Sequence, residues 1–254
     1  MKKDIYLRKF LSLFGEMDKR FDFEEIWSDF LTMSACAISN QADPKHRDER
    51  ETIYMNTVQK YSKDDAFRIK DMLWLSGADL LQNRRDFLCL VSEELGMTNK
   101  HIKQYYTPHE VSSLIAKIVD VELDKGISAP AAVDIIDKKG YINVLDCCCG
   151  TGSLLIGFID EIDRQMKKQQ LNYQNHVQII AQDLSYKAAL ACYVQLSLLG
   201  CAGFVVIGSP FSKPAGTKES IEDAWYTPAF FSDVWIERRR WHYLDQLIKM
   251  HSKP

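Results

Sequence analysis

Apolar residues in the first hundred positions recur at helical spacing. In four segments, apolar side chains lie three or four positions apart, as on the buried face of a helix. Gly96 follows the last of these segments, and glycine commonly follows the last turn of a helix. We therefore predict an all-helical N-terminal domain over residues 1–100. The segments are residues 23–31, 53–61, 67–75 and 87–95.

The pattern changes after residue 100, where short apolar runs alternate with helical segments. The runs are typical of buried strands, because they are short and end at an acid or a glycine. Strands that alternate with helices predict a parallel sheet with helices on both faces. We therefore predict an α/β domain over residues 101–254. Its predicted elements are helix 109–121, strand 141–146, helix 153–169, strand 177–183, helix 185–199, strand 204–207 and a basic amphipathic helix 233–250.

Length and composition are those of an ordinary globular protein with room for a core. The chain has 254 residues, of which 46% are hydrophobic and 26% are charged. Its formal net charge is -3 at pH 7, whereas a protein that holds nucleic acid through bulk charge is basic. Any contact with DNA must therefore come from local basic patches or from a partner subunit.

Cysteines and histidines form neither a metal-binding pattern nor a disulfide framework. Three of the seven cysteines are adjacent, at positions 147–149, and no two are spaced as Cys-x-x-Cys. The six histidines lack metal-ligand spacing, so we predict no metal. No apolar run is long enough to cross a membrane, and no signal-peptide pattern is visible at the start. Because free thiols persist in reducing compartments, we expect a cytoplasmic protein that does not bind membranes.

A glycine-rich turn, Asp146–Ser153, lies between a predicted strand and a predicted helix. It is neither a dinucleotide-binding turn with three glycines nor a phosphate-binding loop with a lysine. Asp183 ends the next strand, and an acid at that place in a doubly wound sheet binds the hydroxyls of a ribose. The turn could also be a plain strand-to-helix connection, and Asp183 or Ser185 could cap the following helix. The order and spacing of the turn and Asp183 favour cofactor binding.

Three motifs in order carry a resemblance to a known family. They are Gln104–Pro108 (Gln-Tyr-Tyr-Thr-Pro), Asp146–Ser153, and Ala181–Asp183 before a long helix. Together they resemble the methylation subunits of type I restriction-modification systems and related adenine-N6 DNA methyltransferases, over about residues 85–211. The resemblance implies a Rossmann-like S-adenosylmethionine-dependent methyltransferase fold, or a truncated form of it, in a protein that acts on DNA. It also implies a specificity-type partner subunit or a homo-oligomer.

The same resemblance implies which residues bind S-adenosylmethionine. Thr107 would lie near the carboxylate of the cofactor, and Asp146 with the glycine-rich backbone would hold the methionine part. Asp183 would bind the ribose. The Tyr-Tyr-Thr-Pro motif could instead be a buried aromatic pair before a helix. The implied cofactor residues are Tyr105, Tyr106, Thr107, Pro108, Asp146, Cys147, Cys148, Gly150, Thr151, Gly152, Asp183 and Leu184.

The catalytic motif of this family is missing. Family enzymes end their fourth strand with Asn/Asp-Pro-Pro-Tyr/Phe, which orients the amine of a flipped adenine. The nearest string here is Gly208 followed by Ser209, Pro210 and Phe211, after the third predicted strand, and Gly208 has no side-chain acceptor. These three residues are the only candidates for a divergent catalytic loop.

Three interpretations of the chain follow from the missing motif. It could be an active DNA methyltransferase with an unusual loop. It could be a non-catalytic, cofactor-binding relative that acts as a DNA-binding or partner subunit. A methyltransferase acting on protein or RNA is a third interpretation. We expect the isolated chain to bind cofactor yet methylate DNA poorly.

Arginines cluster in the last predicted helix and near residue 85. Arg238, Arg239 and Arg240 precede Trp241, a combination that can contact phosphate and stack on a base. The alternative is a solvated helix face in which Trp235 and Trp241 are packing anchors. The pair at residues 84–85 allows the same two interpretations.

Overall fold

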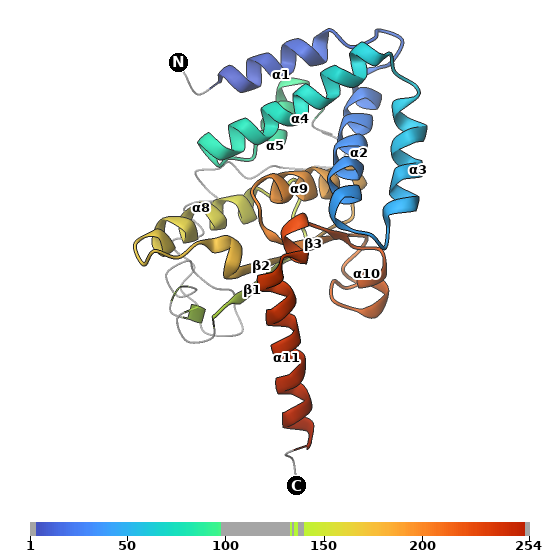
Figure 1. Cartoon of the computed structure of the whole chain (residues 1–254). Coiled ribbons are helices and arrows are strands. Elements are labelled where there is room, and N and C mark those ends of the chain that lie inside the picture. The colour runs from blue at the N-terminus through green and yellow to red at the C-terminus, as the bar shows by residue number, and fades with distance from the viewer. Residues whose placement is uncertain (1–3, 98–132, 134, 137–139, 252–254) are drawn as a thin grey trace.

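The computed structural model describes residues 4–97, 133, 135–136 and 140–251. In residues 4–97 it contains helices and no strand, as the apolar spacing predicts. Figure 1 shows these helices, which together we call the helical layer, on the side of the molecule away from the C-terminus. The five helices of this layer are α1 (Ile5–Gly15), α2 (Phe23–Ala42), α3 (Arg47–Val58), α4 (Lys63–Asn83) and α5 (Phe87–Glu94).

Short polar side chains start three of these helices, and aromatic rings join them. Asp22, Ser62 and Asp86 each accept a hydrogen bond from the backbone amide three positions on, which satisfies an otherwise unpaired helix donor. Phe10 of α1 is fully buried between two other helices. Its ring centroid lies 5.2 Å from that of Phe30 and 5.8 Å from that of Phe87, both edge to face. The helical layer therefore has an aromatic core.

The remainder of the described chain alternates strands and helices. β1, β2 and β3 are strands that the apolar runs predict, whereas β4 has two residues and was not predicted. The elements are β1 (Ile142–Asp146), α8 (Ser153–Lys167), the short 3-10 helix η1 (Tyr173–Asn175), β2 (Val177–Asp183), α9 (Tyr186–Leu198), β3 (Ala202–Ile207), α10 (Lys218–Glu222), β4 (Trp225–Tyr226), the 3-10 helix η2 (Pro228–Phe231) and α11 (Asp233–His251).

The strands form one sheet in the order β1-β2-β3-β4. β1 pairs with β2 and β2 with β3 in parallel, so that Asp146 lies opposite Ala181 and Asp183 opposite Ile207. β4 is antiparallel to β3. The carboxyl ends of the three parallel strands therefore meet at one edge of the sheet. The strands and helices of this part thus form an α/β arrangement, in which the glycine-rich turn and Asp183 lie side by side.

Described helices cover one face of the sheet rather than both. α8 and α9 lie between the sheet and the helical layer, and buried residues of both parts form one continuous core. The opposite face has a small cluster around Phe204 and Val206, against which Phe230 of η2 packs. α11 leaves the sheet on the side away from α1–α5 (Figure 1). We expected helices on both faces of the sheet. In the described part of the chain, helices cover only one face.

None of the helices described is long and apolar enough to span a membrane. The division into two domains near residue 100 stays a prediction, because residues 98–132 lie outside the described chain.

Candidate cofactor site

The glycine-rich turn joins the end of β1 to the start of α8 in a conformation that needs glycine. Gly150 and Gly152 have φ angles of 54° and 103°, in the left-handed region. A Cβ at Gly150 would meet no atom of the described residues within 4 Å, whereas one at Gly152 would lie 3.1 Å from the Sγ of Cys192. The turn is thus tight against α9 at Gly152 and open at Gly150. An open backbone at this edge is a cradle that a ligand can approach closely.

Asp183 is hydrogen-bonded to the glycine-rich turn. One carboxylate oxygen accepts from the amide of Gly150 at 2.8 Å, and the other accepts from the amide of Ser185 at 2.8 Å. Ser185, not Asp183, is the N-cap of α9, because its hydroxyl accepts from the amide of Ala188. Each carboxylate oxygen keeps a second lone pair for a further donor. The glycine-rich turn and Asp183, which were predicted from separate parts of the sequence, are therefore in direct contact.

Asp146 adds a second carboxyl group to this edge. It accepts a hydrogen bond from the amide of Cys148 at 3.1 Å. Burial raises the pKa of Asp146 above its ordinary value, and the negative charge of Asp183 raises this pKa further. The site thus holds two acids that repel each other, and a cationic ligand would relieve this repulsion.

Exposed side chains flank the two acids. Leu184, directly after Asp183, has 73% of its surface exposed, and such an apolar side chain fits the face of an aromatic ring. Cys147 and Cys148 are exposed free thiols, whereas Cys149 is buried. The amide of Cys149 donates to the carbonyl of Gln182 at 2.9 Å, which connects the turn to β2.

The side chain of Thr151 faces away from the open side of the turn. Its hydroxyl donates to the carboxylate of Asp86, at the start of α5 in the helical layer, and the hydroxyl of Ser153 donates to the same oxygen. Asp86 is 6% exposed. The sequence gives no sign of this contact, because a single acid before an apolar run is only a helix cap. Thr151 can therefore serve a cofactor only through its backbone.

The loop after β3 carries the three candidates for a divergent catalytic loop. Phe211 is 97% exposed, and the amide of Phe211 donates to the hydroxyl of Ser209 at 3.3 Å. Gln182 holds this loop, because its amide nitrogen donates to the carbonyls of Gly208 at 3.1 Å and Lys213 at 2.7 Å. Ser209, Pro210 and Phe211 thus follow the third parallel strand, as predicted. The next described strand, β4, is antiparallel and is not a fourth parallel strand.

The Tyr-Tyr-Thr-Pro motif lies outside the described residues. The roles of Tyr105, Tyr106, Thr107 and Pro108 stay predictions.

The basic stretch of α11 lies at the opposite end of the sheet from this site. Trp235 is 1% exposed, and its indole nitrogen donates to the carbonyl of Gln174 at 2.7 Å, just before β2. The guanidinium of Arg238 lies 5.4 Å from the ring of Tyr141, just before β1. α11 therefore packs at the amino ends of the strands. Trp235 is a packing anchor as expected, whereas Trp241 is 68% exposed and is not.

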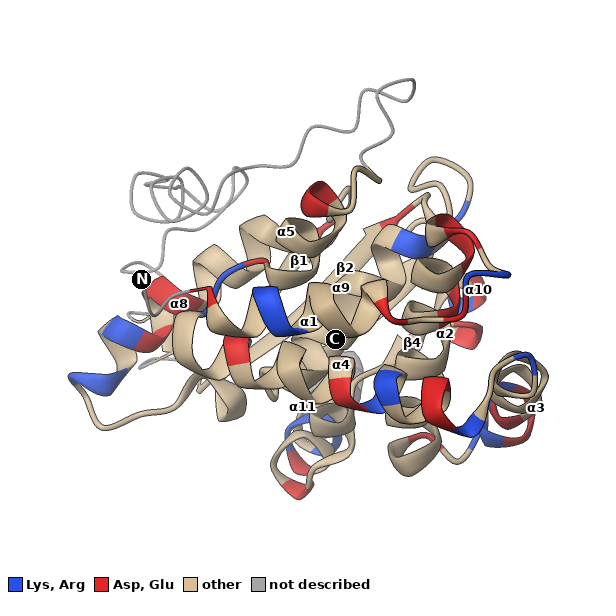
Figure 2. Cartoon of the chain, turned by 90° about the horizontal axis from the view of Figure 1, so that it is seen from above, with Lys and Arg blue, Asp and Glu red and all other residues tan. Residues whose placement is uncertain are grey.

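Several arginines considered for nucleic-acid contact are engaged inside the protein. The guanidinium of Arg239 lies 3.9 Å from the ring centroid of Phe230, and burial lowers the pKa of both Arg238 and Arg239. Arg84 pairs with Asp163, and Arg85 pairs with Asp79 at 2.8 Å. Figure 2 shows acidic and basic residues interspersed along α3 and α4. These arginines support the structural interpretation rather than a DNA-binding surface.

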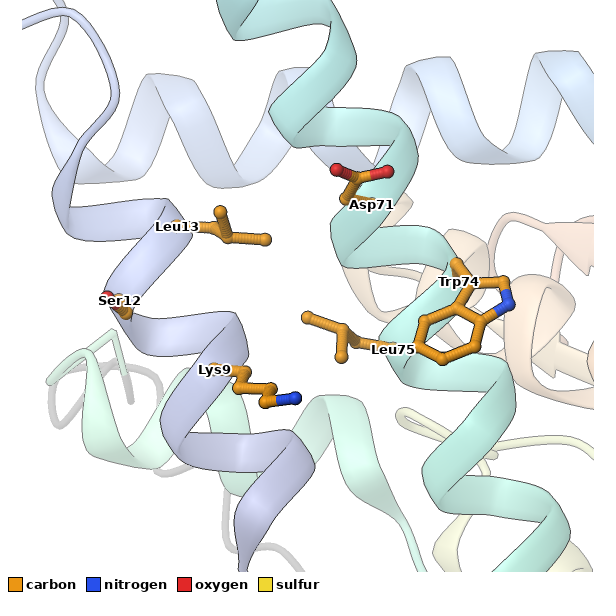
Figure 3. Close-up of a pocket in the computed structure, with 6 residues that line it drawn as sticks. All are labelled: Lys9, Ser12, Leu13, Asp71, Trp74 and Leu75. Atoms are coloured by element: carbon orange, nitrogen blue, oxygen red, sulfur yellow. The ribbon is translucent and has the colours of Figure 1, made fainter.

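A separate groove lies in the helical layer between α1 and α4 (Figure 3). Its volume is about 310 Å³, and Leu13 and Leu75 point toward each other across it. Trp74 forms one wall and is 67% exposed. None of the predicted cofactor residues from Asp146 to Leu184, which the structure describes, lines this groove, so it is distinct from the site at the edge of the sheet.

Comparison with known proteins identifies one family. The sequence model of the family described as N-6 DNA Methylase matches residues 90–246, which is more than half of the chain and includes both the turn and Asp183. No curated protein and no solved structure matches the chain. The chain belongs to the N-6 DNA methylase family.

Proposed function

We propose that the chain binds S-adenosylmethionine at the carboxyl ends of β1, β2 and β3, in a Rossmann-like site similar to that of type I methylation subunits. The observation that carries this proposal is the 2.8 Å hydrogen bond from the amide of Gly150 to Asp183. It brings the turn and the acid together at the edge where doubly wound sheets bind their ligands. Membership of the N-6 DNA methylase family supports the choice of cofactor.

The residues at this edge fit the parts of S-adenosylmethionine. The open backbone at Gly150 and the carboxyl group of Asp146 would hold the methionine part, with its ammonium group. The free lone pairs of Asp183 would accept from the ribose hydroxyls, and Leu184 would pack on the adenine. When bound, the cofactor supplies an electrophilic methyl group. Asp146, beside the turn, would repel phosphates, and the turn has neither the third glycine of a dinucleotide-binding turn nor the lysine of a phosphate-binding loop, which distinguishes the proposed ligand from NAD and ATP.

The proposed role of the isolated chain is cofactor binding with poor methyl transfer to DNA. The acceptor side lacks an Asn/Asp-Pro-Pro-aromatic motif, and loss of one oriented hydrogen bond at a reacting centre costs about 10²–10³ in rate. DNA would then be recognised together with a partner subunit, such as a specificity-type subunit or a second copy. One observation favours active methylation as the second candidate: Phe211 is 97% exposed and follows the strand next to Asp183, where it could stack on a flipped base.

Two measurements test this proposal on the intact chain. Calorimetry should detect binding of S-adenosylmethionine and of its demethylated product, and no binding of ATP or NAD at the same concentrations. Incubation with labelled cofactor and mixed-sequence DNA should then give little labelled adenine. Absence of binding would refute the cofactor assignment, whereas robust turnover would select the second candidate and assign the loop 209–211 to catalysis.

A further inference from the structure

We propose that Asp86 is a positioning residue, through which the helical layer sets the shape of the cofactor turn. This inference rests on the proposed function, because it concerns the same turn. Asp86 begins α5, and the two hydroxyls that it binds, those of Thr151 and Ser153, lie at the start of α8. The contact joins segments that are 65 and 67 positions apart in the sequence.

Four donors converge on the carboxylate of Asp86. Oδ1 accepts from the amide of Cys89 at 3.0 Å and from Nε2 of Gln195 at 2.8 Å, and Oδ2 accepts from the hydroxyls of Thr151 and Ser153. A carboxylate has about four acceptor positions, so all of them are used. A buried carboxylate is costly unless it is hydrogen-bonded. The buried carboxyl group therefore keeps its hydrogen-bond partners only while the turn stays in place.

Gln195 of α9 completes the connection. It is fully buried, and its amide nitrogen also donates to the carbonyl of Thr151 at 2.8 Å. Its side-chain oxygen accepts from the amide of Leu88 at 3.1 Å. α5 and α9 thus hold the turn from behind, while Asp183 holds Gly150 in front. A turn held on both sides is already in its binding shape, so that ligand binding orders little further chain.

A purely structural role as the cap of α5 is the alternative, and Asp86→Asn separates the two. The amide oxygen can replace Oδ1 and keep the bonds from Cys89 and Gln195, which preserves the cap. The amide nitrogen then replaces Oδ2 opposite Thr151 and Ser153: it can donate to the two hydroxyl oxygens but cannot accept from them, so both hydroxyl hydrogens lose their charged acceptor. The turn changes while α5 keeps its start. We expect the affinity for S-adenosylmethionine to fall about tenfold, because bonds to a charged acceptor are lost.

The matched control is Asp29→Asn in α2. Asp29 is 8% exposed and accepts from the hydroxyl of Tyr61 at 3.0 Å and from the ammonium of Lys60 at 3.0 Å. This change also replaces a buried carboxylate in the helical layer, away from the turn. It should lower the unfolding temperature and leave cofactor affinity unchanged. If Asp86→Asn weakened binding only through a general loss of stability, Asp29→Asn would weaken binding as well.

The experiment combines calorimetry with amide hydrogen exchange on the full chain. Exchange of residues 149–155 in the free protein should be faster in Asp86→Asn than in wild type or Asp29→Asn. Ser153→Ala, which removes one donor and leaves Asp86 intact, serves if Asp86→Asn does not fold, and should also weaken binding. The inference is wrong if the folded Asp86→Asn variant binds S-adenosylmethionine with wild-type affinity. If Asp86→Asn does not fold, wild-type affinity in folded Ser153→Ala would overturn it instead. If wild type binds no cofactor, the proposed function fails, whereas the exchange comparison still tests whether Asp86 holds the turn.

Discussion

The sharpest test of the site is Asp183→Ala, because this acid has two separable roles. It holds the turn through Gly150 and the start of α9 through Ser185, each at 2.8 Å. In the proposed complex it also accepts from the ribose hydroxyls. Alanine removes all of these acceptors at once. The expected result is therefore a folded protein with weak cofactor binding.

The two effects have different magnitudes. Loss of a hydrogen-bonded charged acceptor for the ribose should cost about 1.5–3 kcal/mol of binding free energy, which is roughly a tenfold to 150-fold loss of affinity. The two backbone bonds are partly exposed, so their loss should lower the free energy of unfolding by only about 1–2 kcal/mol. For a chain of this size that lowers the unfolding temperature by roughly 2–8 °C. The variant should thus stay folded at 25 °C.

Calorimetry at 25 °C, with thermal unfolding of the same samples, separates the two effects. Asp160→Ala is a suitable control, because Asp160 lies on α8 and pairs with Arg164 one turn away at 2.6 Å. It should change neither affinity nor fold. If folded Asp183→Ala binds S-adenosylmethionine within about twofold of wild type, the ribose role of Asp183 is wrong.

Three further outcomes are expected. Asp146→Asn should raise the free energy of unfolding of the free protein at neutral pH, since burial raises the pKa of this acid and so penalises its ionised form. The difference from wild type should shrink as the pH falls toward 3.8, the ordinary pKa, and calorimetry should show weaker cofactor binding. Arg50→Met should lower the free energy of unfolding by about 3–5 kcal/mol in denaturant titration. Arg50 is 4% exposed, donates to Asp43 at 2.9 Å and lies 4.1 Å from the ring of Trp225. The exposed pair of Arg20 with Asp18 is its control: Arg20→Met should leave the free energy of unfolding nearly unchanged. Phe211→Ala should leave stability within about 0.5 kcal/mol, since its ring is 97% exposed. If the wild-type chain methylates DNA, loss of methyl transfer in that variant, with cofactor affinity unchanged, would assign the loop to catalysis.

Local signals made much of the fold and of the cofactor edge predictable. Helical spacing gave α2, α3, α4 and α5, and short apolar runs gave β1, β2 and β3. The turn with Gly150 and Gly152 was identifiable because its left-handed backbone requires glycine. Asp183 was identifiable because the alternation of strands and helices places the end of β2 beside the turn. Each of these signals lies within a few residues of the feature that it predicts.

Features that depend on distant residues could not be predicted. Asp86 contacts Gln195, 109 positions away, and neither residue belongs to a motif. The sequence around Arg238 and Arg239 suggests a basic surface, yet their guanidinium groups lie against the rings of Tyr141 and Phe230. The two residues of β4 are too few for any alternation to be visible. In each case a tertiary contact, and not the local sequence, decides the role of the residue.

The two sides of the candidate site are prepared to different degrees. On the cofactor side, Gly150 presents an open backbone, Asp183 keeps free lone pairs, and the turn is fixed from behind. On the acceptor side, the polar groups serve the loop itself: the amide of Gly208 donates to the carbonyl of Asp183, and the hydroxyl of Ser209 accepts from Phe211. Catalysis depends on groups that are oriented toward the reacting atoms before reaction begins. This contrast is the physical reason to expect cofactor binding without efficient transfer, unless a partner or bound DNA reorganises residues 208–211.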